Sequence, residues 1–301
     1  MKSNSKALKN RANYSKGILF LISISLHFHS SQFAWSNEVS KNNQNFQSEL
    51  TTIQKSTQVT PSHSNSKSHL DYSGGFGVQS MPMGAAAYVD AGYSHLLWGK
   101  KEGQGFQYGY VRPAARVQTS ALINRAEVYL DFFPISFFGV SSGASLTSRN
   151  TNLYSGVNCT SVECKGTLSR QWIKPKLILG YADFFFIGSL KLETLKHSSM
   201  SPFVDDMNIL IAQSGGDRTT IVDLTVGYQW SGRIATGVHG SSVRMTRSKS
   251  SNRLIDLYAA YQSQHFRYLG GVGLYQSQFS PLSPTAYFLV QWMGRPSFAL
   301  N

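Results

Sequence analysis

The sequence predicts an all-β protein: a transmembrane antiparallel up-and-down β-barrel of about 12 strands, formed by residues 70–301. Two observations lead to this prediction. Only 14% of the 301 residues are charged, whereas 13% are aromatic and 26 are glycine; soluble domains carry roughly 25% charged residues. From residue 71 onwards the chain also divides into segments of roughly 10–14 residues in which apolar and polar residues alternate. Lipid-facing and lumen-facing residues alternate in this way along the strands of membrane barrels.

The N-terminus predicts export. Five basic residues and no acidic residue precede the apolar run 17–28, and Ala34-Trp35-Ser36 offers a small-x-small cleavage site. Such a run is too short to span a bilayer, so residues 1–36 are expected to be a signal peptide. Residues 37–69 are rich in Ser, Asn, Gln and Thr, which predicts a disordered periplasmic tether.

Residues 220–230 show the alternation most clearly. One face carries the apolar side chains Val222, Leu224, Val226, Tyr228 and Trp230, and the other carries Ile221, Asp223, Thr225, Gly227 and Gln229. The other expected strands are residues 69–80, 88–98, 106–119, 126–133, 138–147, 168–181, 185–196, 234–246, 254–262, 266–276 and 286–293.

The stretch YLDFFPISFFG, residues 129–139, is expected to form a strand, a turn at Phe133-Pro134-Ile135 and the next strand. A helix is the weakest interpretation, because Pro134 lacks the backbone donor and clashes with the preceding turn. Phe132 and Phe138 are then expected to face lipid at the inner headgroup boundary, as part of an aromatic girdle.

The connections predict which end of the barrel faces outward. Those at residues 133–135, 182–183, 231–232 and 264–265 are tight, whereas those at 150–166, 198–217 and 247–252 are longer. Tight turns face the periplasm in barrels of this kind. Eleven strands from residue 88 onwards would leave the N-terminus outside the cell, so the segment 69–80 is counted as a twelfth strand; ten or fourteen strands are the alternatives.

With these features, residues 70–301 resemble Gram-negative outer-membrane β-barrel proteins of the porin-like kind, although no particular family is identified. The resemblance is architectural and implies a location in the outer membrane. Such proteins usually end on an aromatic residue that signals barrel assembly. This chain differs, because residues 294–301 follow the last strand and Phe298 is not terminal.

Alternation points many charged side chains into the barrel, since Arg or Lys facing lipid near the midplane costs roughly 2–4 kcal/mol. The predicted lumen-lining residues are Arg112, Arg116, Arg125, Glu127, Asp131, Arg170, Lys174, Lys176, Lys191, Glu193, Asp223 and Asp256. In one interpretation they line a water-filled pore that favours small anionic solutes. In the other, they form ion pairs across neighbouring strands and fill a narrow lumen.

The longer connections carry two further features. Cys159 and Cys164 are the only cysteines, and in an exported chain they are expected to form a disulfide within an extracellular loop. Asp205, Asp206 and Asp217 predict a solvated acidic loop rather than a cation site. No metal site and no cofactor are expected.

The function expected from these features is that of a porin-like passive channel or a surface-exposed structural protein, without enzymatic activity. One alternative is a membrane-rim lipid hydrolase or deacylase built on His239 and Ser241, for which the sequence shows no orienting acid. Another is a secreted soluble β-sandwich binding protein, because its strands also alternate. The basic residues are scattered and no nucleic-acid motif accompanies them, so the expected partners are outer-membrane lipid and small anionic solutes, with no nucleic acid.

Overall fold

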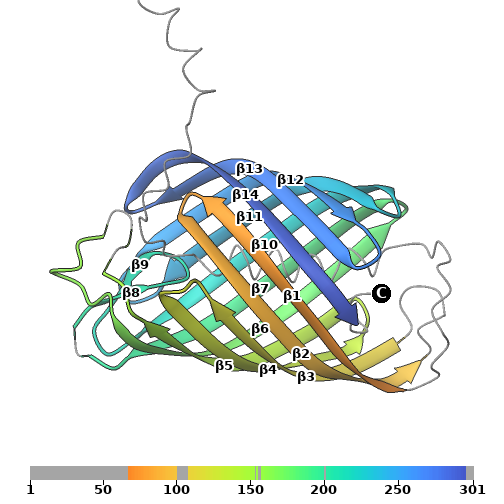
Figure 1. Ribbon diagram of the computed structural model, residues 1–301, viewed down its shortest axis with the longest axis horizontal. Helices are drawn as coiled ribbons and strands as arrows, with labels where there is room; N and C mark the ends of the chain where they lie inside the picture. The colour runs from red at the N-terminus through yellow and green to blue at the C-terminus, as the bar shows by residue number, and fades with distance from the viewer. Residues whose placement is uncertain (1–66, 100–107, 153, 155–156, 200, 296–301) are drawn as a thin grey trace, which may run out of the picture. The chain divides into compact units, whose positions relative to one another are not determined.

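The computed structural model describes residues 67–99, 108–152, 154, 157–199 and 201–295. Twelve of its strands form one closed barrel in which each strand pairs with its neighbours along the chain, and β1 pairs antiparallel with β14 to close the ring (Figure 1). The remaining two strands, β8 and β9, form a separate hairpin. The strands are β1 (Ser68–Ser80), β2 (Met83–Gly99), β3 (Tyr108–Thr119), β4 (Ile123–Ile135), β5 (Phe138–Arg149), β6 (Gly166–Tyr181), β7 (Phe184–His197), β8 (Phe203–Asp205), β9 (Leu210–Ala212), β10 (Asp217–Ser231), β11 (Ile234–Met245), β12 (Ser251–Gln262), β13 (Phe266–Ser277) and β14 (Ser280–Arg295).

The predicted barrel and its twelve strands are confirmed, but one predicted turn is misplaced. β4 continues through Pro134 to Ile135, and the chain turns at Ser136 and Phe137 instead of at residues 133–135. The ladder between β4 and β5 is irregular between Phe132 and Ile135. A proline is tolerated at such a bulge because no ladder hydrogen bond needs its missing donor.

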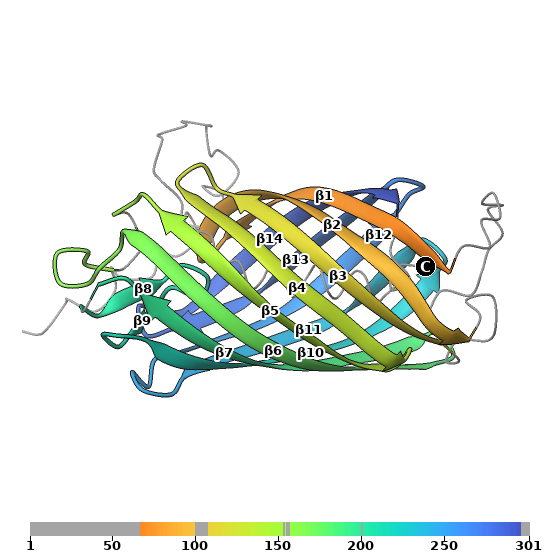
Figure 2. The ribbon, with the colours of Figure 1, turned by 90° about the horizontal axis from the view of Figure 1, so that it is seen from below.

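The two ends of the barrel differ in their connections (Figure 2). At one end, called the inner end, the described turns are tight and consist of residues 136–137, 182–183, 232–233 and 263–265. The other end, called the outer end, carries the longer connections 150–165, 198–216 and 246–250. Three connections at the outer end are also tight, at residues 81–82, 120–122 and 278–279, so the asymmetry is weaker than predicted.

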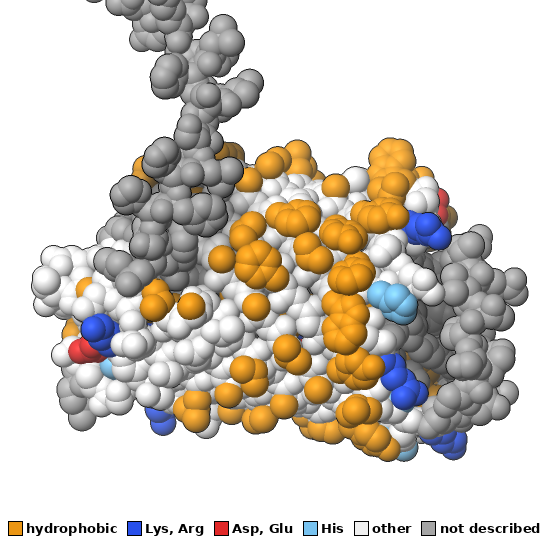
Figure 3. Space-filling view, in the orientation of Figure 1, with side chains coloured by type: hydrophobic (Ala, Val, Ile, Leu, Met, Phe, Trp, Pro, Cys, Tyr) orange, Lys and Arg blue, Asp and Glu red, His pale blue; other side chains and the backbone are white. Residues whose placement is uncertain are grey.

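Many large apolar side chains are exposed on the outer surface of the barrel, and on the face drawn in Figure 3 the charged side chains lie towards its ends. Val226 is 52% exposed and Leu257 is 62% exposed, whereas their inward neighbours Thr225, Gly227, Asp256 and Tyr258 are buried. Exposed aromatic side chains ring the inner end: Tyr72, Tyr93, Trp98, Phe132, Phe138, Tyr181, Phe184, Trp230, Tyr261, Phe266 and Trp292. This is the aromatic girdle expected at a headgroup boundary.

A closed ring has no unpaired sheet edge, so strands can cross a membrane with every backbone group bonded. Combined with the apolar exterior, this is the architecture of an outer-membrane barrel, and the soluble β-sandwich alternative is wrong. Within the described part of the chain, no helix is long and apolar enough to cross a bilayer. The expected signal peptide, most of the expected tether and Phe298 lie outside the described residues; β1 itself begins at Ser68.

The barrel interior and its outer mouth

The barrel interior contains the charged residues of the strands. All the candidate lumen-lining residues place their side chains on the inner face; Arg116 and Asp131 are half-buried and the others are buried. Alternation explains this placement, because each of these residues follows a lipid-facing neighbour along its strand. Whether the same residues line an open, water-filled path stays a prediction.

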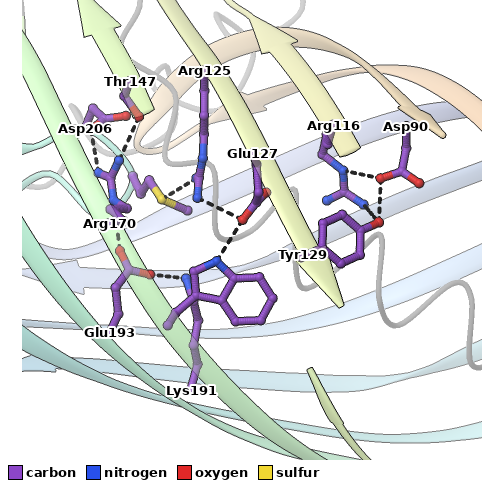
Figure 4. A network of polar contacts seen from close by, with 12 residues as sticks. Asp90, Arg116, Arg125, Glu127, Tyr129, Thr147, Arg170, Lys191, Glu193 and Asp206 are labelled. Atoms are coloured by element: carbon purple, nitrogen blue, oxygen red, sulfur yellow. Dashed lines mark hydrogen bonds and ion pairs between the residues drawn. The ribbon is translucent and has the colours of Figure 1, made fainter. Parts of the chain in front are cut away.

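A first cluster of charges joins β1, β2, β3 and β4. Arg112 lies 2.6 Å from Asp71 and 2.5 Å from Asp90, and Arg116 lies 2.9 Å from the second oxygen of Asp90. The Tyr129 hydroxyl donates to Asp90 at 2.6 Å (Figure 4). Each arginine of this cluster therefore has a carboxylate partner on a neighbouring strand, or one strand further away.

A second cluster, nearer the outer end, centres on Arg170 of β6. Its guanidinium lies 2.9 Å from Glu193, 2.6 Å from Asp205 and 2.5 Å from Asp206. It also donates to the Thr147 hydroxyl at 2.9 Å. Figure 4 shows Arg170 between Thr147, Asp206 and Glu193. The Arg170 side chain therefore connects the barrel wall to Asp205 and Asp206.

Further polar contacts involve other charged residues of the interior. Arg125 lies 3.3 Å from Glu127, and Glu127 accepts a hydrogen bond of 2.9 Å from the Trp172 indole. Lys191 pairs with Glu193, and Lys174 lies 3.9 Å from Asp223. Ion pairs across neighbouring strands, as expected in the second interpretation, join Arg112 and Arg116 to Asp90 and Arg170 to Glu193.

Residues 203–212, here called the mouth hairpin, comprise β8, β9 and their turn, and they fold into the outer end of the barrel. Figures 1 and 2 both show β8 and β9 at the end opposite to the one where β14 finishes. Phe203, Leu210 and Ala212 are fully buried. They pack against inward apolar residues of the wall, which are Leu168, Leu195, Ile221, Val243 and Met245. The wall is apolar at this level because the hairpin covers it.

Polar contacts fix the turn of the mouth hairpin across the lumen. The Asn208 carbonyl accepts a hydrogen bond of 2.9 Å from the Asn252 amide and faces the Tyr275 hydroxyl at 3.4 Å. On the opposite wall, Arg149 donates to the Val204 carbonyl at 2.5 Å. The hairpin is therefore anchored to β5, β6, β12 and β13.

The loop 150–165 forms a second layer over the hairpin. Cys159 and Cys164 form the predicted disulfide. The Glu163 carbonyl accepts a hydrogen bond of 3.1 Å from the Val204 backbone, and the Glu163 backbone donates to the Pro202 carbonyl at 2.8 Å. The two longest outer connections thus make one cap at the mouth.

The prediction of a solvated acidic loop is wrong for Asp205 and Asp206, which are fully buried against Arg170. Burial raises the pKa of Asp205. Burial also acts to raise the pKa of Asp206, but the nearby arginines, first of all Arg170, lower it below its usual value of 3.8. Asp217 instead accepts backbone hydrogen bonds from Arg247 at 2.8 Å and from Ser248 at 2.9 Å.

His239, the candidate base of the hydrolase alternative, lies inside the barrel and not at the membrane rim. It is buried, and its Nδ1 lies 2.9 Å from Asp256, an acid that the sequence analysis did not connect with it. Ser241, however, donates to Asp223 at 2.8 Å. The Ser241 hydroxyl therefore has Asp223 as its hydrogen-bond partner, whereas a serine hydrolase requires a hydrogen bond between the serine and the histidine.

Sequence reasoning missed several residues of the interior. Asp71 was recoverable, because it follows the outward Leu70 in an alternating strand. Arg149 is the last residue of β5, where the alternation of apolar and polar residues no longer indicates which way a side chain points. The mouth hairpin had no recognisable signal, because each of its strands has only three residues.

The chain was compared with known proteins. No protein-family model matches it, and no curated protein matches it. Among solved structures, it is similar to the KdgM porin, with 12% identity and a TM-score of 0.39 over 74% of this chain and 98% of that chain. It is also similar to the NanC porin, with 9% identity and a TM-score of 0.41 over 73% and 98% of the two chains. A third is the translocator domain of the autotransporter NalP from Neisseria meningitidis, with 10% identity and a TM-score of 0.34 over 87% and 99%. No family assignment follows from them.

Proposed function

We propose that this protein is an outer-membrane channel for the passive diffusion of small polar solutes, and that the mouth hairpin narrows its outer entrance. The observation that carries the proposal is the closed ring of twelve strands with charged side chains on its inner face. Side chains alone just fill a ring of about eight strands. A ring of twelve strands is wider than that, and the charged side chains on its inner face favour water in the lumen.

The mouth hairpin occupies part of the outer entrance. Wall strands and the mouth hairpin meet there through Arg170, Arg149 and Asn252, as described above. An entrance built in this way admits small solutes and excludes folded proteins or long polymers. Its ion pairs also set a local field that acts on charged solutes.

A preference for anions is the finer part of the proposal. Lys174 and Lys176 are inward residues of β6, and Lys191 stands beside them on β7. Three lysines on adjacent strands make a basic stripe on one wall, with Asp223 next to it on β10. The stripe favours small anions, because a fixed positive charge raises their local concentration.

The test is planar-bilayer recording with the purified full-length protein, after its folding has been verified by heat-modifiable migration on a gel. Discrete conductance steps are expected. The double variant Lys174→Gln/Lys176→Gln is expected to shift the reversal potential in a salt gradient towards cations. A correctly folded barrel that is silent would contradict the channel and favour the structural role; conductance without a shift would contradict only the anion preference.

A further inference from the structure

Four basic residues stand on the lipid-facing surface at the outer end of adjacent strands. Lys196 of β7, Arg218 of β10, Arg244 of β11 and Arg253 of β12 all alternate with buried inward residues, and all four are exposed. They are called the basic arc here. We propose that the basic arc binds the phosphate group of a phosphorylated lipid headgroup in the outer leaflet.

The register places these four side chains next to one another. Arg218 pairs with Thr194, Arg244 with Thr220 and Arg253 with Ser242. Each basic residue is therefore the diagonal neighbour of the next one, at a separation of about 7–8 Å. Two such side chains can hold one phosphate between them, since guanidinium groups bind phosphate through paired N–H donors.

The same register sets a hydroxyl beside each arginine. Thr194, Thr220 and Ser242 lie directly opposite Arg218, Arg244 and Arg253, on the same outward face. Hydroxyl groups donate hydrogen bonds to phosphate oxygens. Three repeats of one arginine facing one hydroxyl thus form a polar strip that matches an anionic headgroup.

The depth of the basic arc matches a headgroup layer. A strand rises about 3.4 Å per residue, so Arg218 and Trp230 are on the order of 40 Å apart along β10. A tilt of about 40° leaves on the order of 30 Å along the membrane normal, slightly more than an apolar band of about 25 Å. With Trp230 in the inner girdle, Arg218 therefore reaches the headgroups of the outer leaflet.

Ion pairs do not neutralise the basic arc within the described part of the chain. Among the described residues, no ion pair joins any of its four members to a carboxylate; the nearby Asp217 is engaged by backbone N–H groups of Arg218, Arg247 and Ser248. Basic groups placed this closely repel one another, so an anionic ligand relieves the repulsion. At the outer ends of β3 to β6 the outward residues are uncharged: Thr119, Asn124, Ser148 and Thr167.

The experiment is a titration of the folded full-length protein, in neutral detergent micelles, with phosphatidate, with phosphatidylcholine and with inorganic phosphate. Native mass spectrometry reports the bound fraction. Phosphatidate, which carries a phosphomonoester, is expected to bind more tightly than the zwitterionic lipid. Basic residues near an anionic surface contribute about fivefold each. The variant Arg218→Gln/Arg244→Gln/Arg253→Gln is therefore expected to weaken phosphatidate binding on the order of 100-fold.

The control is Lys67→Gln/Arg233→Gln/Arg295→Gln, which removes three exposed basic residues at the inner end. It is expected to bind phosphatidate as the unmodified protein does. Equal losses in both variants, equal binding of the two lipids, or competition by inorganic phosphate at the lipid's own concentration would each overturn the proposal. If the triple variant does not fold, the three single variants, each expected to lose about fivefold, replace it. None of these results depends on conductance, so the proposed channel function is tested separately.

Discussion

Arginine occurs on both faces of this barrel in opposite surroundings. Arg170 is fully buried inside and contacts three carboxylates. Arg244 is exposed on the lipid-facing surface and, among the described residues, has no carboxylate partner. The first is a fixed structural connection, whereas the second is available to a ligand. Position in the alternation, more than residue type, decides which role an arginine takes.

The largest effect is expected from Arg170→Met. The substitution leaves Asp205, Asp206 and Glu193 buried without their shared cation, and breaking a buried pair in this way costs about 3–5 kcal/mol. The folded, fast-migrating gel band should disappear at a lower temperature. Channel conductance should also rise, because the mouth hairpin loses its main anchor.

The matched control is Arg218→Met, the same substitution on the outer face. It is expected to change the free energy of unfolding by less than about 0.5 kcal/mol. Equal melting temperatures for the two variants would show that buried and exposed arginines contribute alike, and would contradict the comparison.

The next largest loss of stability is expected from an arginine introduced on the lipid-facing surface in the middle of a strand. Leu224 is 48% exposed in the middle of β10, and Leu224→Arg should cost about 2–4 kcal/mol. Ser148→Arg, at the outer end of β5, should cost about 0–1 kcal/mol. Equilibrium unfolding by denaturant in lipid vesicles measures both, and equal costs would mean that the outer end does not lie at the headgroups.

Acid should release the mouth hairpin only at low pH. The pKa of Asp206 is lowered below 3.8 in the folded protein, so its pairing with Arg170 stabilises the hairpin above that value and is lost as the pH falls through the lowered pKa. Asp205, whose pKa is raised by burial, takes up its proton earlier without breaking the pair.

Hydrogen exchange at the Ile209 amide, which donates to the Asp205 carbonyl at 2.9 Å, measures this release after correction for intrinsic rates. Protection should persist at pH 5 and fall below about pH 3.8. The Leu224 amide in the barrel wall serves as the reference. Loss of protection already at pH 5 would show that Arg170 does not hold Asp206 ionised.

A smaller effect is expected at the inner girdle. Phe132 is 44% exposed at the inner headgroup boundary, so Phe132→Asn should cost about 1 kcal/mol of apolar contact and slow barrel assembly. The fraction of protein that migrates as the folded gel band after refolding measures this assembly defect. Phe132→Trp should assemble normally, because tryptophan also suits the boundary; a defect there would point to packing instead of lipid contact.

The smallest effect on stability is expected from Arg253→Gln. Because Arg253 is exposed and unpaired among the described residues, the free energy of unfolding should stay within about 0.5 kcal/mol of the unmodified protein, as measured by denaturant unfolding. A cost of several kcal/mol would reveal a structural role for the basic arc.

Much of the fold and part of the site could be predicted from the sequence. Period-two alternation in residues 220–230 correctly assigned Val222 and Leu224 to the lipid face and Asp223 to the interior. Alternation also oriented the candidate charges, because a one-residue change of facing would expose them to lipid. The ion-pair partners of those charges were harder to predict from the sequence, because Arg112 contacts Asp71, which is two strands away.

The sequence by itself determined the barrel, its strand count, its apolar exterior and its inward charges, because these follow from local alternation and turn spacing. Only the tertiary structure decided that Asp205 and Asp206 turn inward to Arg170, that loop 150–165 covers the mouth hairpin, and that four basic residues line up across β7 to β12. The physical reason is that these contacts join residues far apart in the chain. Strand register and ring closure bring such residues together, and neither leaves a periodic signal in the sequence.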